Sequence, residues 1–227
     1  MSRSVILALE TSTTTGSVAV GAGAALVEVR LAPPIRHAEA LLPAIDYALA
    51  TAGVAKRELA GVAIGGGPGS FTGLRIAGAT GKALAHALGV PLFAVSGLLV
   101  QAAALADASS PVCAMFDARR GEVYAACYRF EGAALSVLLE PAVGDALDFV
   151  ERLRAHDVVY LGEGVERNRE RMEEQGARLS GLRGAAPSAA ALLALVAAAP
   201  ERYRVPEPAA WEPAYVRASS AERGLSV

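Results

Sequence analysis

The sequence is poor in charged, aromatic and histidine residues. Charged residues make up 19% of the 227 positions, aromatic residues make up 5%, and there are three histidines. The formal net charge of −2 excludes a strongly basic surface of the kind that binds nucleic acid directly. Hydrophobic residues make up 53% of the chain, which is enough to build a large core and excludes intrinsic disorder.

Two cysteines, Cys113 and Cys127, are too few to form the disulfide framework of a chain of this length. Each lies in a run that we predict to be a strand, and a short turn separates the two runs. The two residues could therefore be neighbours across the strands. We interpret them as buried, reduced thiols that pack like small apolar groups.

Two apolar stretches are long enough to raise the question of a membrane segment. Residues 87–106 carry no formal charge, but Gly, Pro and Ser punctuate the stretch and Gln101 interrupts its apolar end. Residues 185–200 are Ala-rich and short, which indicates one buried helix. The apolar run at the N-terminus stops at Glu10, too early for a signal peptide. We therefore expect no membrane segment and a cytoplasmic location.

The first half of the chain alternates between strand and helix patterns. Continuous apolar runs are typical of strands buried on both faces, and apolar residues at helical spacing indicate helices packed on them. The strands are predicted at 5–9, 17–20, 26–31, 61–64 and 92–95, and the helices at 37–52, 73–88 and 96–106. The order βββαβαβα predicts a mixed sheet covered by helices.

The second half repeats this pattern less regularly. Strands are predicted at 112–116, 122–130, 135–139 and 158–161, and helices at 145–155 and 166–175. A spacing of about 107 residues places Glu10 and Asp117 at equivalent strand ends. We predict a duplicated actin-like (ASKHA, ribonuclease H-like) α/β fold with a first lobe over 1–108 and a shorter, degenerate second lobe over 109–227. The helix at 188–199 is a candidate to pack back on the first lobe.

A glycine-rich run, GGGPGSFTGLR at 65–75, precedes the helix at 73–88, for which Thr72 is the predicted N-cap. Such a run can hold a phosphate on free backbone N–H groups, or it can form a rigid corner that another backbone approaches closely. It is not a P-loop, because the only Gly-Lys pair is followed by Ala83 within the helix. It is not a dinucleotide fingerprint, because residues 59–106 contain no Asp or Glu to bind a ribose.

The helix at 73–88 is apolar around nearly its whole circumference, apart from a basic stripe of Arg75, Lys82 and His86. A helix of this kind must be covered on two sides, and its own sheet covers only one. Either the second lobe or a second subunit covers the other side, and we favour the subunit because the helix at 37–52 shares the property. The predicted partner-binding residues are Leu74, Arg75, Ile76, Ala79, Lys82, Ala83, His86, Leu41 and Ile45.

Five motifs taken together resemble the bacterial TsaB family, also called YeaZ. They are LALETS at 7–12, HAEALLP at 37–43, GPGSFTGLR at 67–75, DARRGEVY at 117–124 and EPAYVR at 212–217. The third and fourth motifs are the most specific. The resemblance covers nearly the whole chain, with one departure: Glu10 stands where the family commonly has Asp.

The resemblance implies a subunit without catalytic residues of its own that is required for threonylcarbamoylation of the tRNA adenosine beside the anticodon. Its implied partners are the catalytic paralogue TsaD and the ATPase TsaE, with a homodimer forming through the same first-lobe helices when the chain is alone. Any contact with tRNA is expected to be indirect or weak. No cofactor is expected apart from ATP or ADP at the subunit interface.

The resemblance also separates the chain from its catalytic paralogue, which holds a metal with two histidines four residues apart on a helix. Here Leu41 stands four residues after His37, so no metal site is expected. A further group of residues is predicted to form either a vestigial nucleotide site or a structural loop. These residues are Glu10, Gly67, Gly69, Ser70, Thr72 and Asp117.

The same residues leave two alternative functions. In a sugar-kinase-type phosphotransferase, Glu10 and Asp117 would hold Mg²⁺ through water and residues 162–164 would contact the nucleotide, but Glu163 would set a negative charge where phosphate binds. In a hydrolase, Ser70 would be the nucleophile, but it lacks the Gly-x-Ser-x-Gly context.

Two further features have simpler interpretations. The pair Arg119–Arg120 is interpreted as a solvated hairpin turn, with a tRNA or subunit contact as the alternative. Trp211 is interpreted as a packing anchor for the C-terminal tail.

Overall fold

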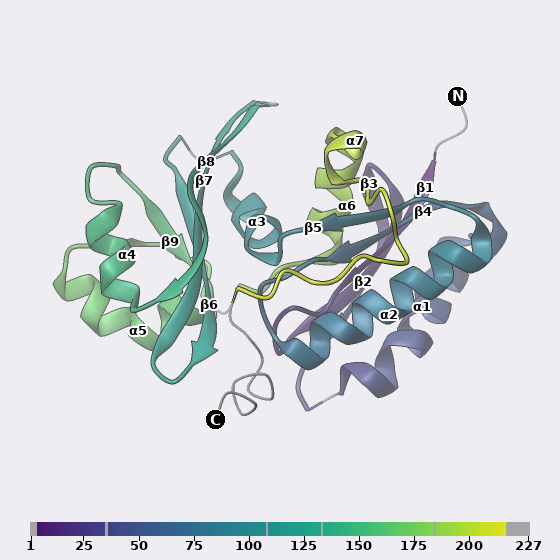
Figure 1. Ribbon diagram of the computed structural model, residues 1–227, viewed down its shortest axis with the longest axis horizontal. Coiled ribbons are helices and arrows are strands. Elements are labelled where there is room, and N and C mark those ends of the chain that lie inside the picture. Colours follow the sequence, from purple (N-terminus) through teal and green to yellow (C-terminus); the bar gives the residue numbers. More distant parts are fainter. Residues whose placement is uncertain (1–3, 35, 108, 133, 184, 217–227) are drawn as a thin grey trace. The chain divides into compact units, whose positions relative to one another are not determined.

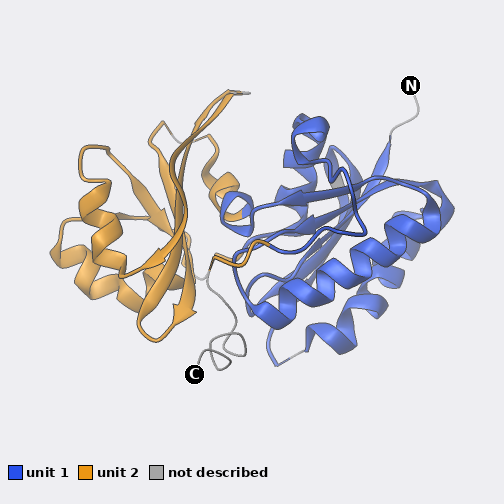
Figure 2. Cartoon of the chain, viewed as in Figure 1, with its two compact units in different colours: residues 1–100, 187–213 blue, residues 101–186, 214–227 orange. Residues whose placement is uncertain are grey.

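The computed structural model describes residues 4–216 except 35, 108, 133 and 184. Its contacts divide the chain into two compact units (Figure 2). Unit 1 is Met1–Val100 with Pro187–Pro213, and unit 2 is Gln101–Ala186 with Ala214–Val227. The sequence-based division at 108/109 differs in two ways: unit 1 ends at Val100, and residues 187–213 return to unit 1 after the chain has passed through unit 2.

The sheet of unit 1 has five strands in the order β3-β2-β1-β4-β5. Strands β1, β2 and β3 pair antiparallel, whereas β1 with β4 and β4 with β5 pair parallel. The strands are β1 (Val5–Glu10), β2 (Gly16–Ala22), β3 (Ala24–Leu31), β4 (Leu59–Gly65) and β5 (Leu92–Val95). The central strands are almost entirely buried, as their apolar runs predict.

Helices cover both faces of this sheet. Helices α1 (His37–Ala52) and α2 (Phe71–Leu88) lie side by side on one face (Figure 1). Helix α6 (Ala189–Ala198) lies on the other. Adjacent residues of β2 show this: a Cβ on Gly16 would lie 2.8 Å from His37 of α1, while the Ser17 hydroxyl accepts the Ala189 N–H of α6 at 2.7 Å. Successive strand residues face opposite sides.

Helix α6 is the element that returns to unit 1 from the second half of the chain. Its side chains are all Ala, Leu or Val, and Leu192, Leu193 and Val196 are fully buried. The open N–H groups of its first turn are accepted by the Ser17 hydroxyl, by Glu28 and by its own N-cap, Ser188. An apolar helix with satisfied end groups therefore closes the second face of the sheet.

Unit 2 repeats the sheet of unit 1. Its strand order is β10-β9-β6-β7-β8, with β6, β7 and β8 antiparallel and β6, β9 and β10 parallel. Read from the β8 edge, both the order and the directions match those of unit 1, which confirms the predicted duplicated actin-like fold. The strands are β6 (Val112–Arg119), β7 (Glu122–Glu131), β8 (Ala134–Gly144), β9 (Val159–Leu161) and β10 (Arg178–Leu179).

Helices α4 (Ala146–Arg152) and α5 (Glu163–Glu174) pack on the sheet of unit 2, and Phe149 and Met172 are fully buried beneath them. Cys113 and Cys127 are register partners on β6 and β7, and both are buried free thiols. The prediction that they are cross-strand neighbours is therefore confirmed.

The remaining elements are short. They are the 3-10 helices η1 (Lys56–Glu58) and η2 (Ala103–Leu105) and the α-helices α3 (Gly97–Ala102) and α7 (Pro200–Tyr203). The sequence did not predict β10, η1 or α7, and the single helix predicted at 96–106 is α3 followed by η2. In the described part of the chain, no helix is long and apolar enough to cross a membrane.

Candidate functional site

The glycine corner, residues 65–73 between β4 and α2, packs directly on the turn that follows β1. A Cβ on Gly69 would overlap the carbonyl oxygen of Ser12, and a Cβ on Gly73 would overlap that of Thr11. Ser70 N donates to Ser12 O at 2.7 Å, and the Thr11 hydroxyl donates to Gly73 O at 2.7 Å. The geometry favours a rigid corner over a phosphate cradle, because the chain's own backbone occupies the approach.

The hydroxyl of Ser70 serves the corner as a helix cap. It accepts the Gly73 N–H at 3.2 Å, so Ser70 and not the predicted Thr72 is the N-cap of α2; Thr72 lies exposed in the first turn. The carbonyl oxygen of Gly67 accepts a hydrogen bond from the Gly97 N–H at 3.0 Å. These bonds give Ser70 a structural role and leave no basis for treating it as a nucleophile.

Glu10 lies beneath this corner and is fully buried. One carboxylate oxygen accepts the Ser12 N–H at 2.7 Å, while Oε2 lies against Gly65 with no hydrogen-bond partner among the described residues. Burial raises the pKa of Glu10, and the hydrogen bonds from Ser12 only partly oppose this. A buried carboxyl group that resists ionisation is poorly suited to hold a hydrated Mg²⁺ ion.

Asp117 occupies the equivalent position in unit 2, and arginines neutralise it. Its carboxylate accepts the Arg119 N–H at 3.0 Å and pairs with the guanidinium groups of Arg119 at 3.5 Å and Arg167 at 3.4 Å. Only 8% of its side chain is exposed. Glu163 lies close by, and burial, with a smaller effect of the Asp117 charge, raises the pKa of Glu163.

The glycines at 162 and 164 are required by close packing of α5 on β6. A Cβ on Gly162 would overlap the carbonyl oxygen of Met115, and one on Gly164 would lie 3.0 Å from that of Phe116. The residues that the phosphotransferase alternative assigned to a nucleotide therefore pack against their own strand. Among the described residues, no group of three or more His, Cys, Asp or Glu side chains is placed to hold a metal.

The arginine pair forms the turn between β6 and β7. Arg119 and Arg120 have φ values of 65° and 58°, followed by Gly121 at 81°. These left-handed conformations cost a non-glycine residue about 1 kcal/mol or more each. Both arginines are exposed, as expected for a solvated hairpin turn.

The predicted partner-binding residues divide into buried and exposed groups. Leu41, Ile45 and Leu74 are each no more than 2% exposed and belong to the core of unit 1 or its buried helix face. The prediction that they contact a partner is therefore wrong, because they form the sides of α1 and α2 that pack on the sheet. Arg75, Ala79, Ala83 and His86 are exposed, whereas Ile76 and Lys82 are half-buried.

Sequence reasoning missed the large apolar side chains that do face outward. Leu42 is 58% exposed, Tyr47 63% and Phe71 39%. The available signal was that Leu42 and Tyr47 are apolar residues off the Leu41–Ile45 face of α1. With Arg75, Ala79, Ala83 and His86, these three residues make up what we call the outer helix surface.

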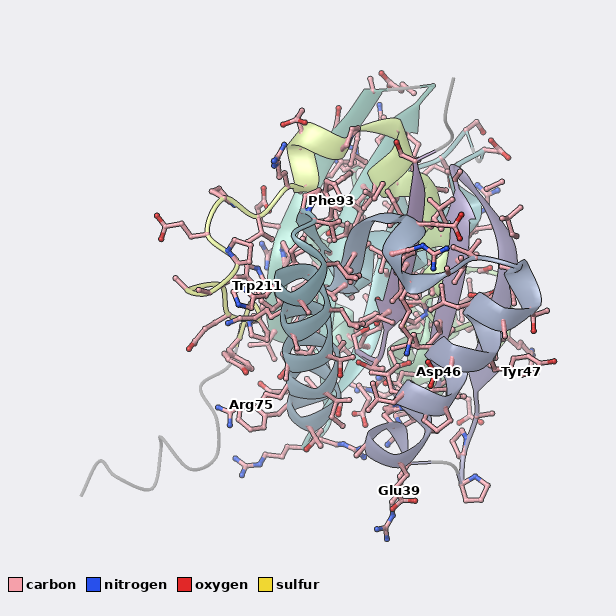
Figure 3. All side chains as sticks on the ribbon, turned by 90° about the vertical axis from the view of Figure 1, so that its right-hand side faces the viewer. Glu39, Asp46, Tyr47, Arg75, Phe93 and Trp211 are labelled. Atoms are coloured by element: carbon pink, nitrogen blue, oxygen red, sulfur yellow. The ribbon has the colours of Figure 1, made fainter. Side chains whose placement is uncertain are left out.

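Charged side chains accompany this surface. Glu39 and Asp46 are exposed on α1, and Arg75 lies at the start of α2 (Figure 3). The Arg75 guanidinium lies 4.1 Å from the centre of the Phe71 ring, one helical turn away. The surface therefore combines exposed apolar groups with acidic residues on α1 and basic residues on α2.

Lys82 is bound within the chain. Its ammonium group donates to the carbonyl oxygens of Ala209 at 2.7 Å and Trp211 at 3.1 Å. The charge of Lys82 is therefore engaged by the C-terminal segment, and its predicted contact with a partner stays a prediction. Trp211 packs against the core of unit 1, which confirms its interpretation as an anchor.

Comparison with known proteins agrees with this architecture. A family model described as "TsaD: tRNA N6-adenosine threonylcarbamoyltransferase" matches residues 34–199. Two proteins named tRNA threonylcarbamoyladenosine biosynthesis protein TsaB are similar to the chain: that of Bacillus subtilis is 31% identical over 140 residues (61% of each chain), and that of Escherichia coli 34% over 147 residues (61% of this chain and 63% of the relative). The matched segments thus span less than two thirds of these relatives.

Solved structures match over almost the whole chain. "YeaZ from Pseudomonas aeruginosa" is 34% identical with a TM-score of 0.78, covering 93% of this chain and 99% of that one. A second structure, described as an uncharacterized protein with similarity to peptidase YEAZ from Pseudomonas aeruginosa, is also 34% identical, with a TM-score of 0.81 over 94% and 100%. With its duplicated sheets and its glycine corner, the chain belongs to the TsaB (YeaZ) family.

Proposed function

We propose that the chain is a non-catalytic subunit in the biosynthesis of threonylcarbamoyladenosine in tRNA, and that it binds a TsaD-like paralogue through the outer helix surface. The observation that carries this proposal is the exposure of Leu42, Tyr47 and Phe71 on the two helices of unit 1. Membership of the TsaB (YeaZ) family supports the role in threonylcarbamoyladenosine biosynthesis. The exposed residues on α1 and α2 support the proposal that the chain takes part by binding a partner.

Physical reasoning supports a protein partner at this surface. Large exposed apolar groups on neighbouring elements are typical of interaction sites, and aromatic residues such as Tyr47 and Phe71 are frequent anchors in interfaces. Ala79 and Ala83 are exposed on α2 between larger residues, and their small side chains let a partner backbone approach closely. A helix of the partner packed along α2 would bury Phe71, Ala79 and Ala83, and a further contact along α1 would cover Leu42 and Tyr47.

Several observations support a role without catalysis by this chain. The glycine corner is filled by its own backbone, Glu10 is buried, and Asp117 is neutralised by arginines. ATP or ADP at the subunit interface would then be held mainly by the partner, and a TsaE-like ATPase would act on the assembled complex. With a net charge of −2, the chain is proposed to contact tRNA weakly or indirectly.

Two further parts of the proposal concern the free chain and its location. Without its partner, the chain would pair with a second copy through the outer helix surface, because the same apolar groups remain to be covered. Because the proposed reaction modifies tRNA, a cytoplasmic location is proposed with it.

The test is co-purification with a TsaD-like paralogue from co-expressing cells. Ala83→Arg sets a large charged group in the centre of the surface and should abolish co-purification while the chain stays folded, because Ala83 is exposed. Ala155→Arg, at an exposed turn of unit 2, is the matched control and should co-purify normally. Retention of the partner by Ala83→Arg would contradict the assigned surface.

A further inference from the structure

The strap, residues 206–213, runs from the edge of the unit 1 sheet onto α2. Just before it, the Val205 N–H donates to Leu92 O at 2.9 Å, which ties the chain to β5. Within it, the N–H groups of Ala210 and Trp211 both donate to Glu207 O, at 3.2 and 3.1 Å. The strap thus contains one closed turn, whose last carbonyl groups have no partner within the turn.

Lys82 satisfies these carbonyl groups. Its ammonium group reaches Ala209 O at 2.7 Å and Trp211 O at 3.1 Å, across more than 120 positions of sequence. A cation at the carbonyl end of a turn is favoured both by its hydrogen bonds and by the backbone dipoles. Lys82 therefore fixes the strap at one defined place along α2.

A glycine socket holds the ring of Trp211 beside this contact. A Cβ on Gly78 of α2 would lie 3.2 Å from the ring, and one on Gly66 of the glycine corner 3.5 Å from it. The absence of side chains at these two positions lets the indole ring approach the backbone closely. Because the ring also packs on the unit 1 core, the strap is built into the fold and is not a loose cover.

The strap borders the outer helix surface. Lys82 is three residues after Ala79 and four before His86, so all three lie along neighbouring rows of α2. Figure 3 shows Trp211 on one side of α2 and the α1 residues Asp46 and Tyr47 on the other. The exposed strap residues Glu207 and Ala209 therefore stand beside the surface, opposite α1.

We propose that Lys82 is a positioning residue for partner binding: by holding Ala209 and Trp211 it fixes the strap as one border of the surface that the TsaD-like paralogue contacts. This inference rests on the proposed function. It adds the strap to the partner surface and gives Lys82 an indirect role.

The experiment compares Lys82→Met with Lys82→Arg in the full chain. Hydrogen exchange measures protection of the strap amides, and calorimetry measures affinity for the paralogue. Lys82→Met should speed exchange at Ala210 and Trp211 and weaken binding about tenfold, the loss expected for charge-assisted hydrogen bonds. Lys82→Arg can donate to the same carbonyls and should restore both.

The control is Arg178→Met in unit 2, which removes another cation that bonds across a long sequence distance, to Asp157 at 2.8 Å and Ser110 at 3.0 Å. It should change neither readout. If Lys82→Met does not fold, Trp211→Ala tests the strap instead, with the same expected effects on exchange and affinity.

The outcomes separate the two proposals. A wild-type chain that does not bind the paralogue would contradict the proposed function, and this inference with it. A binding wild type beside a Lys82→Met variant with a loosened strap and unchanged affinity would overturn the inference alone. The inference would also be overturned if Arg178→Met weakened binding of the paralogue as much as Lys82→Met does.

Discussion

Glu10 and Asp117 make the same hydrogen bond in the two units: each carboxylate accepts the backbone N–H two residues further on, at 2.7 Å from Ser12 and 3.0 Å from Arg119. The two residues stand near the ends of β1 and β6, the equivalent central strands. The duplication therefore extends from strand order to side-chain detail. The surroundings differ, since Asp117 is paired with arginines whereas Glu10 is fully buried against Gly65 and accepts its hydrogen bond from Ser12.

This difference predicts that Glu10 lowers the stability of the folded chain in a pH-dependent way. Its pKa in the folded chain is raised above the ordinary value of 4.5 by burial. Below that value the carboxyl group is protonated in both states and its contribution to stability is fully present. As the pH rises, Glu10 ionises at a lower pH in the unfolded chain than in the folded chain. The stability that Glu10 contributes is therefore lost between the pKa of the unfolded chain and the higher pKa of the folded chain.

Glu10→Gln should therefore raise the melting temperature at pH 7 to 8, and the gain should disappear below about pH 4.5. Thermal unfolding over a pH series measures this, with exposed Glu174→Gln as the control. A gain that grows toward low pH would show that the buried group is ionised in the folded chain.

The tight approach at Gly73 predicts a large loss of stability on adding one carbon atom. A Cβ at this position overlaps the Thr11 carbonyl oxygen, and backbone on both sides leaves little room to move. Gly73→Ala should lower the free energy of unfolding by about 2–3 kcal/mol. Gly181→Ala, where a Cβ would meet nothing within 4 Å, should be close to neutral in the same denaturant titration.

Neighbouring leucines on α1 should separate core packing from partner binding. Leu41 is 1% exposed, so Leu41→Ala should cost about 2–5 kcal/mol of stability. Leu42 is 58% exposed, so Leu42→Ala should change stability by less than about 0.5 kcal/mol yet weaken binding of the paralogue. Denaturant titration measures the stability of the two variants, and calorimetry measures their affinity for the paralogue. A large loss of stability in Leu42→Ala together with a small one in Leu41→Ala would contradict the prediction.

The sequence predicted the architecture better than the surface. The bounds of α1 were predicted to the residue, and equivalent strands in both halves indicated the duplication. Periodicity could not decide which apolar face the sheet covers when two faces of a helix are apolar. Leu41 and Leu74 were for that reason assigned to the surface.

Long-range contacts were the other limit. Nothing local to Lys82 indicates that it bonds to Trp211, more than 120 residues away. The cap of α2 was placed at Thr72 because both hydroxyl residues precede an apolar run, and only the geometry of the corner selects Ser70.

Asp117 tests the phosphotransferase alternative. Asp117→Asn removes the charge that pairs with Arg119 and Arg167, and it should lower stability by about 1 kcal/mol after allowance for the exposure of both arginines. The isolated chain should show no ATP turnover that this substitution abolishes. Turnover by the wild type that is lost in Asp117→Asn would revive the phosphotransferase.

The most direct measurement of the outer helix surface is hydroxyl-radical footprinting of the chain with and without its TsaD-like paralogue. Tyr47 and Phe71 should become protected in the complex, while exposed Val137 of unit 2 should react equally in both samples. Unchanged reactivity of Tyr47 and Phe71 in a complex that has formed would contradict the account.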